Sequence, residues 1–490
     1  MNHPPAPGAS VMNASARTAL RRWAAKVPPA VIAWALGLLS FLALMPGVMS
    51  SDSADQLGEA RTGDVSDWHS PLLVQMWRLL LPLGDAGTTM LALQHALFWA
   101  GASLLAASLT RTGRRLQAWA VLAVCLLPHF VFFNRYILKD TAHYSAMFLC
   151  AALLFAAVSS PPERVLRNLM LAVFACAVLV PIRINGAFAV AGLTVVLLLP
   201  RIKVTLWRVW LGVMVVSLLL VMFSRWINTE VLRARSSDVI QSLQIHDLMG
   251  IQYHSRDASV WGPYALSNEE VDNCYTAYHW DIMGPTGVCA GMRQRIGASN
   301  GRQFPPEAVN QRGALWLKAI SAHPVAYARH RLRQFNSATY FVVPAFHVRF
   351  SKSIRDGRKE GTEPITPADV RLDYVKKNFL LWPATWLAGG LGALLLLWPR
   401  MRETASAHFG VALLASGLAY GLAYLVIGVA TDVRYFLWTQ LSIALALVVA
   451  WPDFCASWQK HDWRRAFAVA GVIGVVVIGL GARLANVPFV

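Results

Sequence analysis

The sequence predicts an all-α polytopic membrane protein, and three observations support this class. Of the 490 residues, 56% are hydrophobic and only 14% are charged, whereas a soluble domain has about 25% charged residues. The mean hydropathy is positive, at +0.45. The apolar residues are also gathered into long runs, a pattern that excludes disordered, collagen-like and disulfide-scaffold proteins.

A helix that crosses about 30 Å of hydrocarbon needs roughly 20 mostly apolar residues. This length predicts about 11 transmembrane helices, at residues 29–49, 86–109, 116–134, 143–159, 165–182, 186–200, 206–224, 378–398, 407–429, 434–451 and 466–484. The first apolar run is too long for a signal peptide and lacks a small-residue cleavage site, so we expect it to be retained. Residues 71–83 are expected to form an interfacial helix rather than a span.

The distribution of Lys and Arg predicts the orientation of these helices. With residues 1–28 as a cytoplasmic tail, the inner segments hold 17 basic residues, and the short outer loops with the C-terminal tail hold seven. The inner segments then carry +13 of the net charge of +18. We attribute this surplus to an anionic membrane surface rather than to nucleic acid. The prediction is a bacterial inner-membrane protein with a cytoplasmic N-terminus and a periplasmic active face.

The predicted helices also divide the chain into domains. Residues 29–224 form an N-terminal transmembrane module with an outer loop at 50–85. Residues 225–376 form a mixed periplasmic domain between the seventh and eighth spans, and residues 377–490 form the C-terminal module. An oxidising compartment allows Cys274 and Cys289 to pair, and two free cysteines are the alternative. Residues 336–348 are too short to cross, and the sequence leaves open whether they are interfacial or inserted.

Polar residues gather where this topology places the outer ends of the helices, although charges at membrane depth are costly. Each has a structural alternative: the acids could cap a helix, Lys139 and Asp140 could pair, and the arginines could snorkel. Together they suit transfer from a lipid phosphate, because a carboxylate accepts a proton or binds a metal and cations hold phosphate. They are Asp52, Asp55, Gln56, His69, Lys139, Asp140, Arg183 and Arg434.

Short motifs in these loops resemble those of the GT-C glycosyltransferases, which include protein O-mannosyltransferases and lipid A aminoarabinose transferases. The resemblance lies in the first outer loop, with Asp52-Ser53-Ala54-Asp55-Gln56 and then Trp68-His69-Ser70-Pro71. The Lys139-Asp140 pair, Arg183-Ile184-Asn185-Gly186 and His323-Pro324-Val325-Ala326-Tyr327 are also similar to bacterial members. The Asp-Glu pair common in protein mannosyltransferases is replaced here by two aspartates separated by two residues.

The resemblance implies an inverting transferase that uses a polyprenyl-phosphate sugar donor and an extracytoplasmic glycan, lipid or protein as acceptor. Asp52 would be the base or a metal ligand, with Asp55 in support, and a divalent cation such as Mg²⁺ or Mn²⁺ would be compatible with them. Donor phosphate would be bound by Lys139, Arg183 and Arg434, and substrate would be oriented by Gln56, His69 and Asp140.

Two other functions remain open from the sequence. An O-antigen polymerase or ligase is also polytopic, but the acidic cluster directly after the first span argues against it. A lipid-carrier flippase or solute transporter would place polar residues near the bilayer midplane, where this sequence is mostly apolar.

Overall fold

The computed structural model describes residues 27–198, 205–264, 266–280, 289, 306–344, 378–460, 462–485 and 487. Nearly all of the predicted cytoplasmic tail, and residues 345–376 of the predicted periplasmic domain, lie outside the described residues. The described part of the chain is almost entirely helical, which agrees with an all-α membrane protein.

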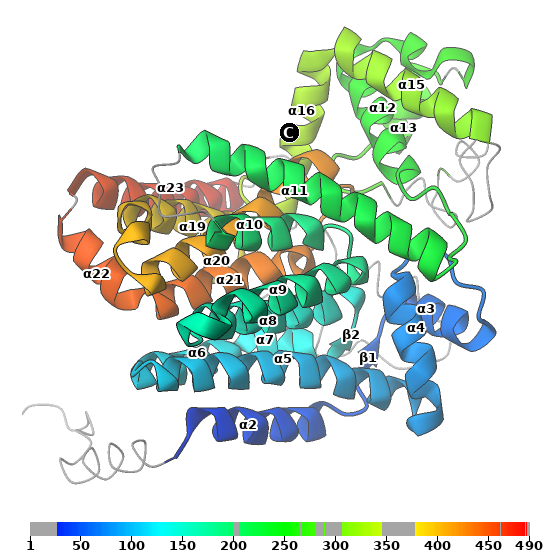
Figure 1. Ribbon diagram of the computed structural model, residues 1–490. Coiled ribbons are helices and arrows are strands. Elements are labelled where there is room, and N and C mark those ends of the chain that lie inside the picture. The colour runs from blue at the N-terminus through cyan, green and yellow to red at the C-terminus, as the bar shows by residue number, and fades with distance from the viewer. Residues whose placement is uncertain are drawn as a thin grey trace, which may run out of the picture.

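The main body is a helical bundle built from both ends of the chain (Figure 1). The N-terminal half contributes α2 (Pro29–Leu44), α5 (Ala86–Arg111), α6 (Arg115–Cys125), α7 (Pro128–Asn134), α8 (Lys139–Val158), α9 (Pro162–Leu179), α10 (Gly186–Leu198) and α11 (Leu206–Trp226). The C-terminal half contributes α19 (Pro383–Leu397), α20 (Ala405–Ile427), α21 (Leu437–Val449), α22 (Trp451–Lys460) and α23 (Asp462–Leu484).

Small residues let the central helices approach closely, as is usual where helices pack in a membrane. At Gly101 of α5, a Cβ atom would lie 2.9 Å from the backbone nitrogen of Leu149 on α8. At Gly192 of α10, it would lie 2.7 Å from the carbonyl oxygen of Ala415 on α20. These contacts hold α8, which begins with Lys139, against α5, and hold α10 against α20.

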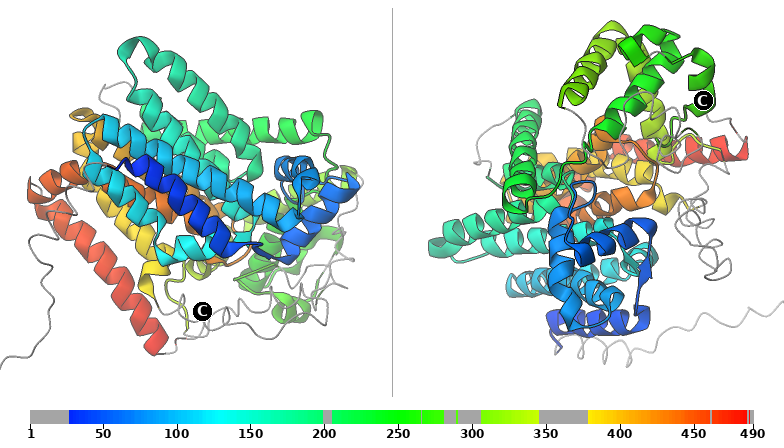
Figure 2. Two further views of the ribbon diagram at one scale, coloured as in Figure 1. Left: turned by 90° about the horizontal axis from the view of Figure 1, so that it is seen from below. Right: turned by 90° about the vertical axis from the view of Figure 1, so that its right-hand side faces the viewer.

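The helices α11 and α23 lie on the outside of the bundle (Figure 2), and only 17% of the apolar stretch of each is buried. A contiguous exposed apolar surface of this kind is typical of contact with lipid. The protein is therefore embedded in a membrane.

Six helices of the described chain are long and apolar enough to cross a membrane, and the number rises to eight if each of two bent helix pairs is one span. The predicted count of 11 spans is not confirmed. The helices at 29–44 and 186–198 have 16 and 13 residues, and the predicted span at 116–134 is bent by 58° between α6 and α7. Hydropathy measures apolar content and does not report where Pro128 breaks a helix.

A second, smaller domain follows α11, and we call it the α12–α16 domain. Its described helices are α12 (Gln241–Ser255), α13 (Asn268–Cys274), α15 (Pro306–Ala322) and α16 (Pro324–Ala338). A disulfide joins Cys274 to Cys289, with a Cα–Cα distance of 6.0 Å. The domain packs around α12, whose Ile245, Leu248 and Ile251 are fully buried.

Two short helices, α3 (Ser51–Thr62) and α4 (Pro71–Leu80), lie at one end of the bundle, and the α12–α16 domain lies toward that same end (Figure 1). A parallel pairing of β1 (Val48–Met49) with β2 (Tyr136–Ile137) fixes the position of α3. Because β1 immediately precedes α3 and β2 nearly adjoins α8, this pairing brings the first turns of the two helices together.

Candidate functional site

The site begins at the N-terminus of α3, where Asp52 lies in the first turn. Ser50 caps the helix by accepting a hydrogen bond from the backbone nitrogen of Ser53, at 3.2 Å. The Ser53 hydroxyl also donates to the carbonyl oxygen of Ile137. The cap and the link to β2 fix the helix end, and an acidic residue in a first helical turn is favoured by the helix dipole.

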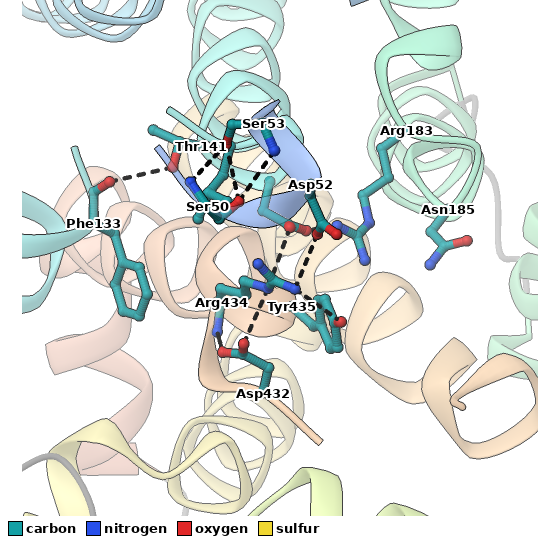
Figure 3. Close-up of polar contacts among 12 residues, drawn as sticks. Ser50, Asp52, Ser53, Phe133, Thr141, Arg183, Asn185, Asp432, Arg434 and Tyr435 are labelled. Carbon is teal, nitrogen blue, oxygen red and sulfur yellow. Dashed lines mark hydrogen bonds and ion pairs between the residues drawn. The ribbon is translucent and has the colours of Figure 1, made fainter. Parts of the chain in front are cut away.

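Arg434 contacts Asp52 from the opposite end of the sequence (Figure 3). It lies in the 3₁₀ helix η8 (Val433–Phe436), whose N-cap residue is Asp432. The Arg434 guanidinium lies 3.4 Å from a carboxylate oxygen of Asp52, 3.6 Å from one of Asp140 and 3.0 Å from one of Asp432. Arg434 is therefore already paired with three carboxylates.

Arg183 also has several partners within the site. It forms an ion pair with Asp140, whose side chain is 1% exposed. Its other terminal nitrogen donates to the Tyr424 hydroxyl at 3.0 Å, and its guanidinium lies 4.8 Å from the centre of the Tyr435 ring. Arg183 and Asp140 thus form a buried pair that joins the loop before α10 to the start of α8.

Lys139 differs from the two arginines. It lies at the start of α8, half-buried, next to Asp140. Within the described residues, its ammonium group has no hydrogen-bond or ion-pair partner, although its charge acts on Asp52. Arg183 and Arg434 are each paired with a carboxylate, whereas Lys139 has neither a hydrogen-bond nor an ion-pair partner among the described residues.

The remaining predicted residues of the first loop lie beside this cluster. His69 is 3.9 Å from Asp55, whose side chain is 73% exposed. The Gln56 side chain is buried, and its amide nitrogen donates to the Asp52 carbonyl oxygen at 2.9 Å. This contact favours a structural role for Gln56 over the predicted contact with a sugar hydroxyl.

The surrounding cations control the ionisation of Asp52. Burial raises the pKa of its carboxyl group, but the charges of Arg434, Lys139, His69 and Arg183 outweigh burial and lower the pKa to about 2. Asp52 is therefore a carboxylate at any physiological pH.

The same cations affect whether the site can hold the divalent metal ion that the resemblance allows. A carboxylate paired with a guanidinium and facing an ammonium group offers a divalent cation a repulsive field. Within the described residues, no group of three or more His, Cys, Asp or Glu side chains is arranged to hold a metal ion. Asp52 and Asp55 do not fit a metal site, and no step below uses one.

The site also contains four residues for which the sequence predicted no role. Tyr424 bonds Arg183, and Asn185 donates to the same hydroxyl at 3.3 Å. Asp432 holds Arg434, and Tyr435 lies against both arginines. Asp432, Tyr435 and Asn185 lie within two residues of the predicted arginines in sequence, which is a usable signal. Tyr424 lies within an apolar helix, where nothing local distinguishes it.

The structure thus brings Asp52, Lys139, Asp140, Arg183 and Arg434 into one cluster of alternating charge at one end of the bundle. Figure 3 shows Asp52, Arg183 and Arg434 of this cluster. Such a cluster can bind an anion at Lys139 and accept a proton at Asp52. No protein-family model, curated protein or solved structure matches the chain.

Proposed function

We propose that this protein is an integral-membrane glycosyltransferase that moves a sugar from a polyprenyl-phosphate donor to an extracytoplasmic glycan, lipid or protein. The observation that carries the proposal is that Asp52 lies 3.4 Å from Arg434 and within the field of Lys139, which has no hydrogen-bond or ion-pair partner among the described residues. The likeness of the loop motifs to GT-C enzymes supports the same chemistry.

In the proposed reaction, the acceptor hydroxyl oxygen attacks the anomeric carbon of the donor sugar. The bond between that carbon and the phosphate oxygen breaks, and the electron pair leaves with the phosphate. Asp52 accepts the hydroxyl proton, and Lys139 and Arg434 stabilise the charge that develops on the departing polyprenyl phosphate. Attack from the face opposite the phosphate inverts the anomeric centre.

The basic residues of the short loops support the proposed location. They favour a bacterial inner membrane with the N-terminus in the cytoplasm, which would place Asp52 on the periplasmic face. The donor's isoprenoid chain would then lie among the bundle helices, with its phosphate at the level of α3.

A pKa of about 2 makes Asp52 a weak base in the free protein. A bound phosphate would offset the charges of Lys139 and Arg434 and add a negative charge nearby, so it would raise the pKa of Asp52. Donor binding would thereby make Asp52 a stronger base while the sugar is in place.

This coupling predicts a difference between two pH profiles. The profile of kcat/KM reports the free enzyme and that of kcat reports the substrate complex. Because the deprotonated form of Asp52 is active and bound phosphate raises its pKa, we expect the acidic limb of kcat at higher pH than that of kcat/KM. Steady-state kinetics from pH 8 down to the acidic limit of stability would check this. We expect kcat to fall at a pH where kcat/KM is still unchanged, and a parallel fall of both would contradict it.

We expect Lys139→Met to weaken phosphate binding without destabilising the fold. A charge-assisted hydrogen bond contributes about 1.5–3 kcal/mol, so the Kd for polyprenyl phosphate should rise by about 10- to 100-fold. Because Lys139 has no ion-pair partner among the described residues, thermal stability should change little. Lys318→Met, an exposed lysine of α15, is the matched control. An unchanged Kd in Lys139→Met would remove Lys139 from the phosphate site.

The function itself is tested with purified protein in lipid nanodiscs. Labelled polyprenyl-phosphate sugars are supplied with an envelope extract, and we expect label to appear in an acceptor only when the donor is present. Transfer from pyrophosphate-linked donors alone would indicate a polymerase or ligase. Movement of carrier lipid across vesicles without any transfer would indicate a transporter.

A further inference from the structure

The segment 428–431 joins α20 to η8, and all four of its residues contact the α12–α16 domain. The contacts come from α16 and from the end of the loop after α13. Arg331 donates a hydrogen bond to the Gly428 carbonyl oxygen at 2.6 Å, and the backbone N–H of Trp280 donates to the Val429 carbonyl oxygen at 2.9 Å. Gln334 donates to the Ala430 carbonyl oxygen at 3.4 Å. The hydroxyl groups of Ser337 and Thr431 are 2.6 Å apart.

The next residues along the chain belong to the site. Asp432 accepts hydrogen bonds from the backbone nitrogen of Arg434 at 2.9 Å, and its other carboxylate oxygen lies 3.0 Å from the Arg434 Nε. The position of Arg434 beside Asp52 therefore depends on where segment 428–431 is held.

Among the residues that contact segment 428–431, Arg331 carries a charge, and its own position is fixed by an ion pair. Its second terminal nitrogen lies 2.6 Å from Asp247, which also pairs with His330 at 3.1 Å and accepts a hydrogen bond from Trp316 at 2.8 Å. Asp247 and His330 are completely buried. Burial raises the pKa of Asp247, but the hydrogen bond from His330 and the charge of Arg331 outweigh it and keep the pKa below the ordinary value.

Segment 428–431 fits closely against α16. A Cβ atom at Gly428 would lie 2.5 Å from the Oε1 atom of Gln334 and 2.5 Å from the Tyr424 carbonyl oxygen. A larger residue cannot occupy this position unless the segment moves, because the added atom would lie closer to both oxygens than van der Waals packing allows and the Tyr424 oxygen belongs to the backbone of α20.

The same domain also contacts the loop that follows α3. Ser66 pairs with Arg235 in a parallel bridge, and the backbone nitrogen of Ser237 donates to Asp67 at 2.6 Å. The domain and the segment that leads into α12 thus contact both the loop after α3, which is the helix that carries Asp52, and the segment before Arg434.

We propose that Arg331 is a positioning residue, anchored on Asp247, that holds segment 428–431 so that Arg434 stays beside Asp52 and Asp140. Its kinetic consequence rests on the proposed function, whereas its structural consequence is independent of any activity.

The test compares Arg331→Gln with Arg256→Gln in the full-length protein in nanodiscs. Arg256 is a matched control because its ion pair with Asp272, at 2.6 Å, is exposed and in the same domain. Hydrogen exchange of the peptide 428–436 should be at least about tenfold faster in Arg331→Gln and unchanged in Arg256→Gln, because the segment loses its anchor. With labelled polyprenyl-phosphate sugar as donor, kcat should fall by about 10- to 100-fold, since a small misplacement of a catalytic group is costly.

Gly428→Ala tests the same contact from the other side and leaves Asp247 and Arg331 intact, so it decides the matter if Arg331→Gln does not fold. It should also accelerate exchange in 428–436. Unchanged exchange in that peptide in both variants would overturn the proposal. Faster exchange in a protein whose wild type transfers no sugar would support the positioning role and count against the glycosyltransferase function.

Discussion

Asp52→Asn should abolish sugar transfer while leaving the donor bound. An amide cannot accept the hydroxyl proton, and loss of a general base typically costs about 10²- to 10⁴-fold in rate. Replacing the carboxylate also removes a negative charge near the phosphate, so the Kd for polyprenyl phosphate should stay the same or fall. Single-turnover transfer of label and equilibrium binding, measured on the same preparation, separate the two effects.

Variants of two other acidic residues serve as comparisons in this experiment. Asp55 lies one turn further along α3, is 73% exposed and contacts only His69 by ion pairing within the described residues. Asp55→Asn should therefore reduce transfer by less than about tenfold. Glu163 is exposed at the far end of α9 and serves as the control, so Glu163→Gln should behave as wild type. Wild-type transfer by Asp52→Asn, or an equal loss in Asp55→Asn, would show that Asp52 is not the base.

Arg183→Met should strongly destabilise the bundle, because it leaves the Asp140 carboxylate buried without its main partner. Breaking one side of a buried ion pair costs about 3–5 kcal/mol. We expect the lower end of that range, since Arg434 remains 3.6 Å from Asp140. Unfolding of the purified protein in mixed detergent micelles gives the free energy directly.

The double variant Arg183→Met with Asp140→Asn separates a pairing effect from a loss of packing. If the destabilisation comes from the uncompensated charge, neutralising Asp140 should recover about 0.5–3 kcal/mol relative to the sum of the single effects. Additive effects would mean that Arg183 stabilises the bundle through its contacts with Tyr424 and Tyr435 instead.

Much of the architecture follows from local sequence. Long apolar runs predicted the helices at 86–109, 143–159, 165–182, 206–224, 407–429 and 466–484, and the structure has a membrane-length helix at each of these places. Apolar content alone does not establish the predicted total of 11 spans. Breaks such as Pro128, and helices as short as 186–198, depend on packing against neighbours rather than on composition.

The candidate site was predictable in its residue types and not in its pairings. Asp52 follows the apolar run at 29–49, and Lys139 precedes the run at 143–159. A charged residue so close to an apolar run is unusual and therefore indicates a functional site. Asp52 and Arg434, however, are 382 residues apart, and no local pattern indicates that they meet.

The sequence by itself determined that this is a helical membrane protein with charges concentrated at a few helix ends. This was possible because hydropathy and charge are properties of short segments. Only the tertiary structure decided that Arg183 and Arg434 are paired with carboxylates, that Lys139 has no such partner among the described residues, and that the α12–α16 domain holds the segment before Arg434. Electrostatic pairing depends on distances between helices, and those distances are set by how the whole chain packs.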